Sequence, residues 1–134
     1  MQVHTLDPYW LDFDQATWLH ACRRPGQGLL GFSPLLVELT ALFPHPGHAT
    51  HKEMPVVLRP GKDIKPHAHK EHLLIYYPFE HVCALLVDNI RYEPSANTAV
   101  YLPPGANHSV ETNHTQTPRI SVALRWETET TNWL

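Results

Sequence analysis

The sequence contains only two cysteines, Cys22 and Cys83, and they lie far apart along the chain. Two distant cysteines do not supply the dense disulfide framework of small secreted domains, so we expect free thiols in a reducing compartment, with a single disulfide between them as the alternative. A long apolar run of the kind that spans a bilayer is also missing. The first residues, MQVHTLDPYW, lack a basic stretch followed by an apolar one, so we expect no secretory signal and a cytoplasmic location.

The sequence also lacks a large excess of charge of either sign. The 10 Lys and Arg residues face 13 Asp and Glu residues, which gives a formal net charge of −3. This balance creates no field that would draw the chain to nucleic acid or to an anionic membrane, so we expect neither as a partner. Internal repeats and low-complexity segments are missing too, and 134 residues suit one domain with a single modest core.

Proline and histidine are abundant, with 13 and 11 residues. The prolines interrupt the chain often enough to argue against a helical bundle. Residues 12–24 predict a short helix that ends at Pro25-Gly26. Ser33-Pro34 has the form of an N-cap followed by a proline at the first helical position, so residues 35–43 predict a second helix. A buried strand suits that second run equally well.

Short runs rich in β-branched and aromatic residues begin near residue 54, and each is bounded by Pro, Gly or Asn. Regular spacing of this kind predicts an antiparallel sheet, arranged as a sandwich or a small barrel. We therefore expect a mainly β protein with one or two N-terminal helices. Its single domain would cover residues 1–134, with a helical part over about 1–45 and a β-barrel over about 54–127.

The segment GKDIKPHAHKEHLLIYYP, residues 61–78, concentrates potential metal ligands. If residues 65–71 are extended, His67, His69 and Glu71 point to one face and His72 to the other. Imidazole and carboxylate are the usual protein ligands of divalent first-row metals. A further ligand has to come from another strand, and His108, after a Pro-Pro-Gly turn, is the obvious candidate. An isolated His-x-His pair is by itself a weak indication of a metal site.

The surroundings of these histidines resemble the two-part motif of the cupin superfamily. Gly61 is followed after five residues by His67-x-His69, and the second part is Pro103-x-Gly105-x-x-His108. The resemblance covers roughly residues 55–126 and implies a double-stranded β-helix, or jelly-roll, barrel that holds one metal at its mouth. Cupin motifs usually carry a glutamate four or five residues after the second His, and here those positions are Leu73 and Leu74. The implied ligand set is therefore three side chains with open positions.

A second resemblance concerns the strand RISVALRW. Arg119 and Ser121 stand two apart, about ten residues after His108, as in the 2-oxoglutarate site of the Fe(II)/2-oxoglutarate oxygenases that share the cupin barrel. The segments LRPGKDIKPH, HLLIYYP and HSVETNHTQTPRISVAL resemble the aspartyl/asparaginyl β-hydroxylase type. This resemblance implies that Arg119 and Ser121 hold the distal carboxylate of 2-oxoglutarate. A guanidinium group grips a carboxylate with two parallel hydrogen bonds, which suits this role. An arginine at the start of a strand also commonly pairs with a surface carboxylate.

The resemblances leave the metal ligands open. The general oxygenase motif uses His69, Glu71 and His108; the β-hydroxylase type pairs His67 with His108; the cupin motif uses His67, His69 and His108. The implied function is a non-haem Fe(II)- and 2-oxoglutarate-dependent dioxygenase that hydroxylates a small molecule or a peptide side chain.

The alternative function is a small metal-binding cupin with Fe, Zn, Mn or Ni: an isomerase, a dioxygenase without 2-oxoglutarate, or a ligand sensor. A metal-free barrel is a third reading. Cupin-like barrels often pair through their sheets, so a homodimer is consistent with the resemblance. The aromatic residues Tyr76, Tyr101 and Trp126 suit either the barrel lining or an ordinary core.

Overall fold

The computed structural model of the protein describes residues 1–5 and 52–126. These residues form nine strands: β1 (Gln2–Thr5), β2 (Lys52–Leu58), β3 (Ile64–His67), β4 (His72–Tyr77), β5 (Leu85–Val87), β6 (Ile90–Tyr92), β7 (Thr98–Leu102), β8 (His108–Val110) and β9 (Arg119–Trp126). No helix occurs among them, and the helices predicted over 12–24 and 35–43 lie outside the described residues. Within the described ranges, no helix is therefore long and apolar enough to cross a membrane.

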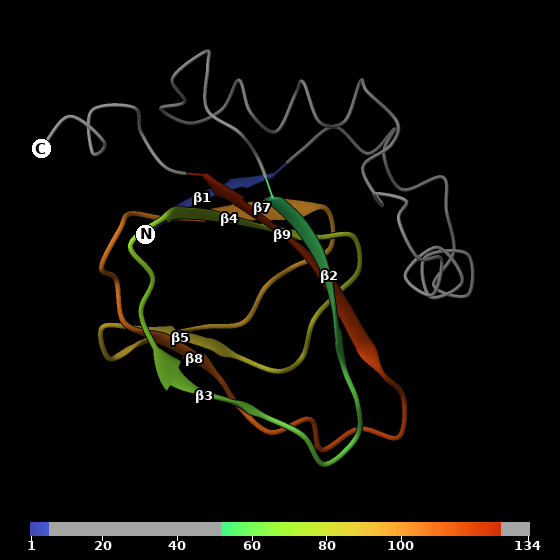
Figure 1. Cartoon of the computed structure of the whole chain (residues 1–134). Helices are drawn as coiled ribbons and strands as arrows, with labels where there is room; N and C mark the ends of the chain where they lie inside the picture. Colours follow the sequence, from blue (N-terminus) through green and yellow to red (C-terminus); the bar gives the residue numbers. More distant parts are fainter. Residues whose placement is uncertain (6–51, 127–134) are drawn as a thin grey trace, which may run out of the picture.

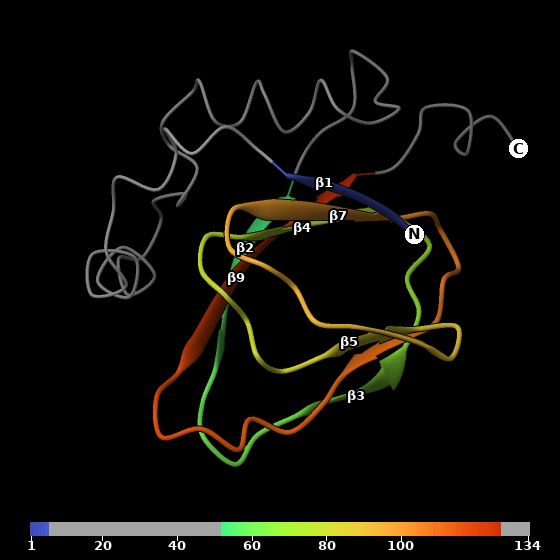
Figure 2. The ribbon, with the colours of Figure 1, turned by 180° about the vertical axis from the view of Figure 1, so that it is seen from behind.

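The strands form two antiparallel sheets that face each other as two layers (Figures 1 and 2). The larger sheet has the order β1-β7-β4-β9-β2, and the smaller sheet has the order β3-β8-β5-β6. The long pairing between β2 and β9 runs from Lys52 opposite Arg125 to Leu58 opposite Arg119. The mainly β class, built of two antiparallel sheets, is as predicted.

Strand β1 was not predicted, because residues 2–5 were assigned to the helical N-terminal part. In the structure they form the edge of the larger sheet, with Gln2 opposite Tyr101 and Thr5 opposite Thr98. Four residues are too few to show a period, and the pairing partner lies about a hundred residues further along the chain. The strand is thus set by a long-range contact that local sequence patterns do not contain.

Strands β4 and β9 lie at the centre of the larger sheet, and residues on both of their faces are buried. Leu73, Ile75 and Tyr77 of β4 belong to the hydrophobic core between the sheets, together with Leu85, Val87, Val100, Leu102, Ala106 and Ala123. The alternate residues Leu74 and Tyr76 point to the opposite face and are completely buried there. A strand buried on both faces shows a continuous apolar run, which is what LLIYY is.

Candidate metal centre

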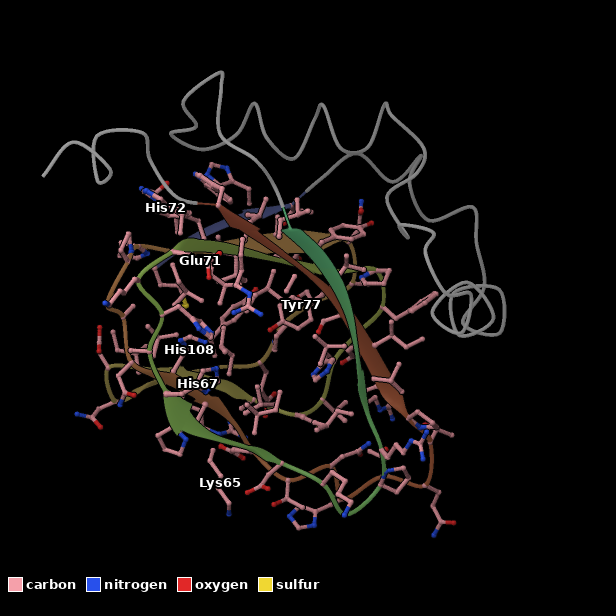
Figure 3. All side chains as sticks on the ribbon, in the orientation of Figure 1. Lys65, His67, Glu71, His72, Tyr77 and His108 are labelled. Carbon is pink, nitrogen blue, oxygen red and sulfur yellow. The ribbon has the colours of Figure 1, made fainter. Side chains whose placement is uncertain are left out.

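His67 and His108 lie side by side on neighbouring strands of the smaller sheet. They stand opposite in the antiparallel register of β3 and β8, and their ring centroids are 4.2 Å apart. Figure 3 shows both side chains directed into the space between the sheets, whereas Lys65 projects away from it. The register between Ile64 and His67 is irregular, which re-aims the end of β3. This irregularity brings the last residue of the strand to the interior.

His69 joins the pair although it lies beyond the end of β3. Its ring centroid is 4.7 Å from that of His67 and 5.1 Å from that of His108. Its backbone carbonyl accepts a hydrogen bond from the Gly105 N–H at 2.8 Å. Gly105 adopts a φ of 82°, a left-handed conformation that favours glycine. This backbone hydrogen bond joins the two halves of the cupin-like motif in addition to the pairing of β3 with β8.

The nearest ring nitrogens of His67, His69 and His108 all lie within 4.8 Å of one another. Two imidazole nitrogens bound to one first-row metal at about 2.0–2.1 Å each stand no more than about 4.2 Å apart. The observed spacing of up to 4.8 Å is only slightly wider than this limit. The residues therefore fit a metal ion.

The hydrogen bonds of two rings fix which nitrogen faces the candidate centre. His67 Nδ1 lies 2.7 Å from the carbonyl oxygen of Lys65, and His108 Nδ1 lies 3.0 Å from that of Ala106. A carbonyl oxygen only accepts, so both Nδ1 atoms carry the proton and both Nε2 atoms keep a lone pair. Metal-binding histidines are commonly oriented by this kind of hydrogen bond. His67 and His108 thus each keep an Nε2 lone pair that could bind a metal.

The pKa values of two of the histidines are lowered, which favours the neutral form of each ring. Burial lowers the pKa of His108, and the neighbouring His67, His69 and Arg125 lower it further, against the Ala106 carbonyl, which raises it. Burial also lowers the pKa of His69, followed by the charge of Arg125 and by His67, while Glu71 opposes the shift. Neutral imidazole is the form that binds metals. The site is therefore suited to a metal at neutral pH.

Glu71 does not join the three histidines. Strand β3 ends at His67, and residues 68–71 are irregular, with a bend at 70–71, rather than the extended segment that the alternation assumed. One carboxylate oxygen of Glu71 instead lies 3.8 Å from Arg125 Nη1. His72 begins β4 and lies on the far side of the larger sheet (Figure 3), where its ring stacks on Trp126 at 5.3 Å. Of the four predicted metal ligands, the structure brings together His67, His69 and His108.

The three histidines lie at a largely apolar cavity of about 300 Å³ between the sheets. Its remaining lining comprises Val56, Leu58, Ile64, Leu73, Ile75, Tyr77, His81, Leu85, Val110, Ser121, Ala123 and Arg125. Leu73 occupies one of the two positions at which cupin motifs usually carry a glutamate, so an apolar side chain faces the cavity there. Tyr77, His81 and Ser121 add polar groups. His81 Nδ1 lies 3.1 Å from the carbonyl oxygen of Cys83 and therefore donates to it, and burial lowers the pKa of His81.

Of the two residues predicted to bind 2-oxoglutarate, Arg119 and Ser121, only one lies at the cavity. Ser121 lines the cavity, but Arg119 is not among the lining residues. The Arg119 Nε donates to Thr115 Oγ1 at 3.3 Å. Arg125, six residues further along β9, lines the cavity instead, and its Nη1 lies 3.4 Å from His69 Nδ1.

Sequence reasoning missed Arg125, although the period of two along the strand places residues 119, 121, 123 and 125 on one face. The same period explains the aromatic residues. Tyr76, Tyr101 and Trp126 do not line the cavity but are buried on the other face of the larger sheet. Cys83 is a buried free thiol, as expected, and Cys22 lies outside the described residues.

Comparison with solved structures gives the class of fold. A cupin 2 conserved barrel domain protein from Salinispora arenicola superposes with a TM-score of 0.52 at 27% identity, covering 69% of this chain and 76% of that one. An RmlC-like cupin from Shewanella frigidimarina gives 0.50 at 17% identity, with 61% and 70% covered. The polyketide cyclase RemF from Streptomyces resistomycificus gives 0.50 at 18% identity, with 60% and 56% covered. No protein-family model and no curated protein matches the sequence.

The described part of the chain thus has a cupin fold. The three histidines at its cavity suggest a metal ion, as in a small metal-binding cupin.

Proposed function

We propose that the protein is a small metal-binding cupin that holds one first-row metal ion through His67, His69 and His108 and takes a small organic molecule into the adjoining cavity. The observation that carries the proposal is the cluster of three ring nitrogens within 4.8 Å at the cavity wall. All-imidazole donors suit Fe, Zn, Ni or Cu better than Mg or Ca, which prefer oxygen. A metal held in this way polarises a bound oxygen or orients a substrate.

The remaining residues of the site position the ligand and exclude water. The Lys65 and Ala106 carbonyls hold two rings in the tautomer that presents Nε2. Leu73, Ile75 and Val110 surround the space beside them with apolar side chains. A dry surrounding strengthens every electrostatic interaction inside it. An enzyme such as an isomerase or a dioxygenase, and a ligand sensor, would use the same arrangement.

Metal titration tests the proposal directly. Chelator-treated protein should bind about one equivalent of Zn(II) or Fe(II). His67→Ala and His108→Ala should each lower the affinity more than about 100-fold, because even loss of an outer hydrogen-bond partner of a ligand costs about 10–100-fold. His114→Ala, at an exposed histidine outside the cluster, is the matched control and should bind as the wild type does. Equal affinity of the wild type and both cluster variants would overturn the proposed site, and no binding of metal to any of the proteins would favour a metal-free barrel.

The second candidate function is the Fe(II)- and 2-oxoglutarate-dependent oxygenase. Two observations favour it: Ser121 lines the cavity, and a guanidinium group stands beside the histidines, although this group belongs to Arg125 and not to Arg119. Anaerobic protein with Fe(II) and 2-oxoglutarate should then show a weak visible charge-transfer band and, on exposure to oxygen, should release succinate. Arg119→Ala should abolish 2-oxoglutarate binding and spare the metal if Arg119 anchors the cosubstrate. If neither signal appears and 2-oxoglutarate does not stabilise the protein, this candidate is excluded.

A further inference from the structure

Arg125 places a permanent positive charge at the candidate metal centre. Its side chain is 21% exposed and projects from β9 into the same cavity as Ser121 and Ala123. The Nη1 atom lies 3.4 Å from His69 Nδ1 and 3.8 Å from Glu71 Oε1. Both distances are long for a guanidinium group, which forms its strong contacts at about 2.7–2.9 Å. The contacts to His69 and Glu71 are therefore weak ones.

Metal binding breaks the contact between Arg125 and His69, whichever ring nitrogen becomes the ligand. A guanidinium group only donates, so the contact requires a lone pair on His69 Nδ1. If Nδ1 binds the metal, that lone pair is used. If Nε2 binds the metal, Nδ1 carries the proton and faces the guanidinium as a second donor. Metal binding therefore removes His69 as an acceptor of the Arg125 guanidinium group.

Among the residues that the structure describes, the charges near the occupied site add up to a net positive value. A divalent ion on three neutral imidazoles contributes two positive charges, and Arg125 contributes a third. Glu71, half-buried at 20% side-chain exposure, contributes one negative charge. A monoanionic group that bridges the metal and the guanidinium would offset part of the remainder. Carboxylate suits this place, because it accepts from arginine with two oxygens.

The rest of the cavity limits the chemistry of the molecule that carries this anionic group. Val56, Leu58, Leu73, Ile75 and Val110 supply apolar walls, and the volume is about 300 Å³. An apolar cavity of about 150 Å³ holds benzene, so twice that volume accommodates a substituted ring or a short alkyl chain. A strongly polar body, such as a sugar or a nucleotide, would find further polar partners only at Tyr77, His81 and Ser121 among the lining residues, and it would leave its other hydrogen-bonding groups unpaired against the apolar walls.

We infer that Arg125 is the anion-binding residue of the cavity and that the ligand class is a small carboxylic acid with an apolar or aromatic body. Its carboxylate would lie between the metal and Arg125, and its body would lie against the apolar walls. This inference rests on the proposed metal site and goes beyond it by naming the ligand chemistry and the residue that selects it.

The test compares acids with their neutral amides. Full-length protein loaded with Zn(II) is titrated by calorimetry with benzoate, phenylacetate and hexanoate, and with the corresponding amides, while zinc content is measured separately. At least one acid should bind at least 10-fold more tightly than its amide. Arg125→Gln should remove this preference and leave the zinc content unchanged, and Arg125→Lys should restore part of it. Glu71→Gln should strengthen acid binding, since it removes the competing negative charge.

Arg91→Gln is the matched control, because Arg91 is an exposed arginine whose guanidinium pairs with Glu93 and Glu111 outside the cavity. This variant should keep the wild-type preference for acids.

The outcomes separate the two proposals. If zinc is retained but none of the acids binds better than its amide, or if Arg125→Gln keeps the preference, the inference is overturned while the metal site stands. If the wild type holds no zinc, the proposed function fails. The same titrations on the metal-free protein then decide the role of Arg125: a preference that Arg125→Gln abolishes supports it, and no preference overturns it.

Discussion

The chemistry of the cavity depends, at the scale of single residues, on a few polar side chains set in apolar walls. The Nδ1 atoms of His67 and His108 each donate a hydrogen bond to the backbone carbonyl two residues earlier in the chain, which leaves Nε2 as the nitrogen with a lone pair. Arg125 supplies the charge beside them, and Leu73 faces the cavity where many cupins carry a carboxylate. If the three histidines bind a metal, residue 73 is therefore the position at which a fourth protein ligand would be added.

Leu73→Glu should convert the site from three protein ligands to four. The leucine is 5% exposed and faces the cavity, so the carboxylate would point toward the same space as the histidines. Carboxylate ligands favour Mn(II), so the affinity for Mn(II) should rise at least 10-fold in a metal titration. The metal-free variant should lose about 2–5 kcal/mol of unfolding free energy, because a buried leucine is replaced by a polar group.

Leu73→Gln is the matched control for this prediction. It should cost a similar amount of stability, measured by urea unfolding, without any gain in Mn(II) affinity. The two variants differ only in the charge and donor chemistry of one terminal group. Equal Mn(II) affinities of Leu73→Glu and Leu73→Gln would show that residue 73 does not reach the metal.

Much of the candidate site could be predicted residue by residue, because the spacing of its residues along the sequence matches that of a known motif. Gly61, His67, Gly105 and His108 stand at motif distances, and the structure confirms that His67 and His108 come together. The position of Glu71 could not be predicted from alternation. The strand ends four residues before it, at a bend held by the Gly105 N–H from the other half of the motif. That hydrogen bond joins residues 36 positions apart, and no local pattern records it.

At the scale of the strands, the alternation of residues predicts which face of the sheet a side chain occupies. It predicts less reliably how far along the cavity that side chain lies. The period of two in β9 assigns Arg119, Ser121 and Arg125 to one face, and the structure places Ser121 and Arg125 at the cavity. Arg119 and Arg125 are separated by roughly 20 Å along an extended strand. Which of them stands beside the histidines depends on the register of β9 against β4, where Arg125 pairs with Leu73. Register is a tertiary property, so the sequence alone did not indicate that Arg125 stands beside the histidines.

Asn113 holds the loop between β8 and β9 against the end of β2. It is 1% exposed, and its side-chain amide donates to the carbonyls of Leu58 at 2.8 Å and Thr117 at 3.0 Å. Its Oδ1 accepts from the backbone N–H of Thr115 at 2.9 Å and from its hydroxyl at 2.6 Å. The backbone of Asn113 also exchanges hydrogen bonds with Gly61 and Lys62 in the turn between β2 and β3. One residue thus connects three elements of the barrel.

Asn113→Ala should lower the unfolding free energy by about 2–4 kcal/mol, because several buried polar groups lose their partner at once. Urea unfolding monitored by tryptophan fluorescence measures this change. The adjacent exposed residue offers a control: His114→Ala should change the unfolding free energy by less than about 0.5 kcal/mol. A small effect of Asn113→Ala, similar to that of the control, would show that the loop is held by other contacts.

At the scale of the whole molecule, the two described sheets are joined by the hydrophobic core between them, and the candidate metal centre lies at the cavity next to this core. The fold class was predictable, because short β-branched runs separated by turn residues leave few alternatives to two antiparallel sheets. The strand order and the edge strand β1 were not, since both depend on pairings between distant segments. A metal at the three histidines would add a further link, between β3, β8 and the bend that follows β3.

Metal binding should therefore stabilise the entire described barrel. At a free metal concentration of 100 times Kd, the unfolding free energy rises by about 2.7 kcal/mol. For a chain of this size, that corresponds to a Tm increase of roughly 6–10 °C. Scanning calorimetry with Zn(II) should show the increase at pH 7.5, and EDTA should reverse it. His108→Ala should show little or no increase, whereas His114→Ala should match the wild type.

The Tm increase that the metal causes should become smaller as the pH falls. Metal binding requires neutral imidazoles, so protons compete with the metal. The pKa values of His69 and His108 are lowered from 6.5, mainly by burial, so these rings stay neutral below the pH at which free histidine becomes charged. The Tm increase should consequently persist as the pH falls from 7.5 to about 6.5, and it should be lost at lower pH as the two rings protonate. An increase that stays constant down to pH 4.5, where neutral imidazole is scarce, would mean that the metal binds elsewhere on the protein.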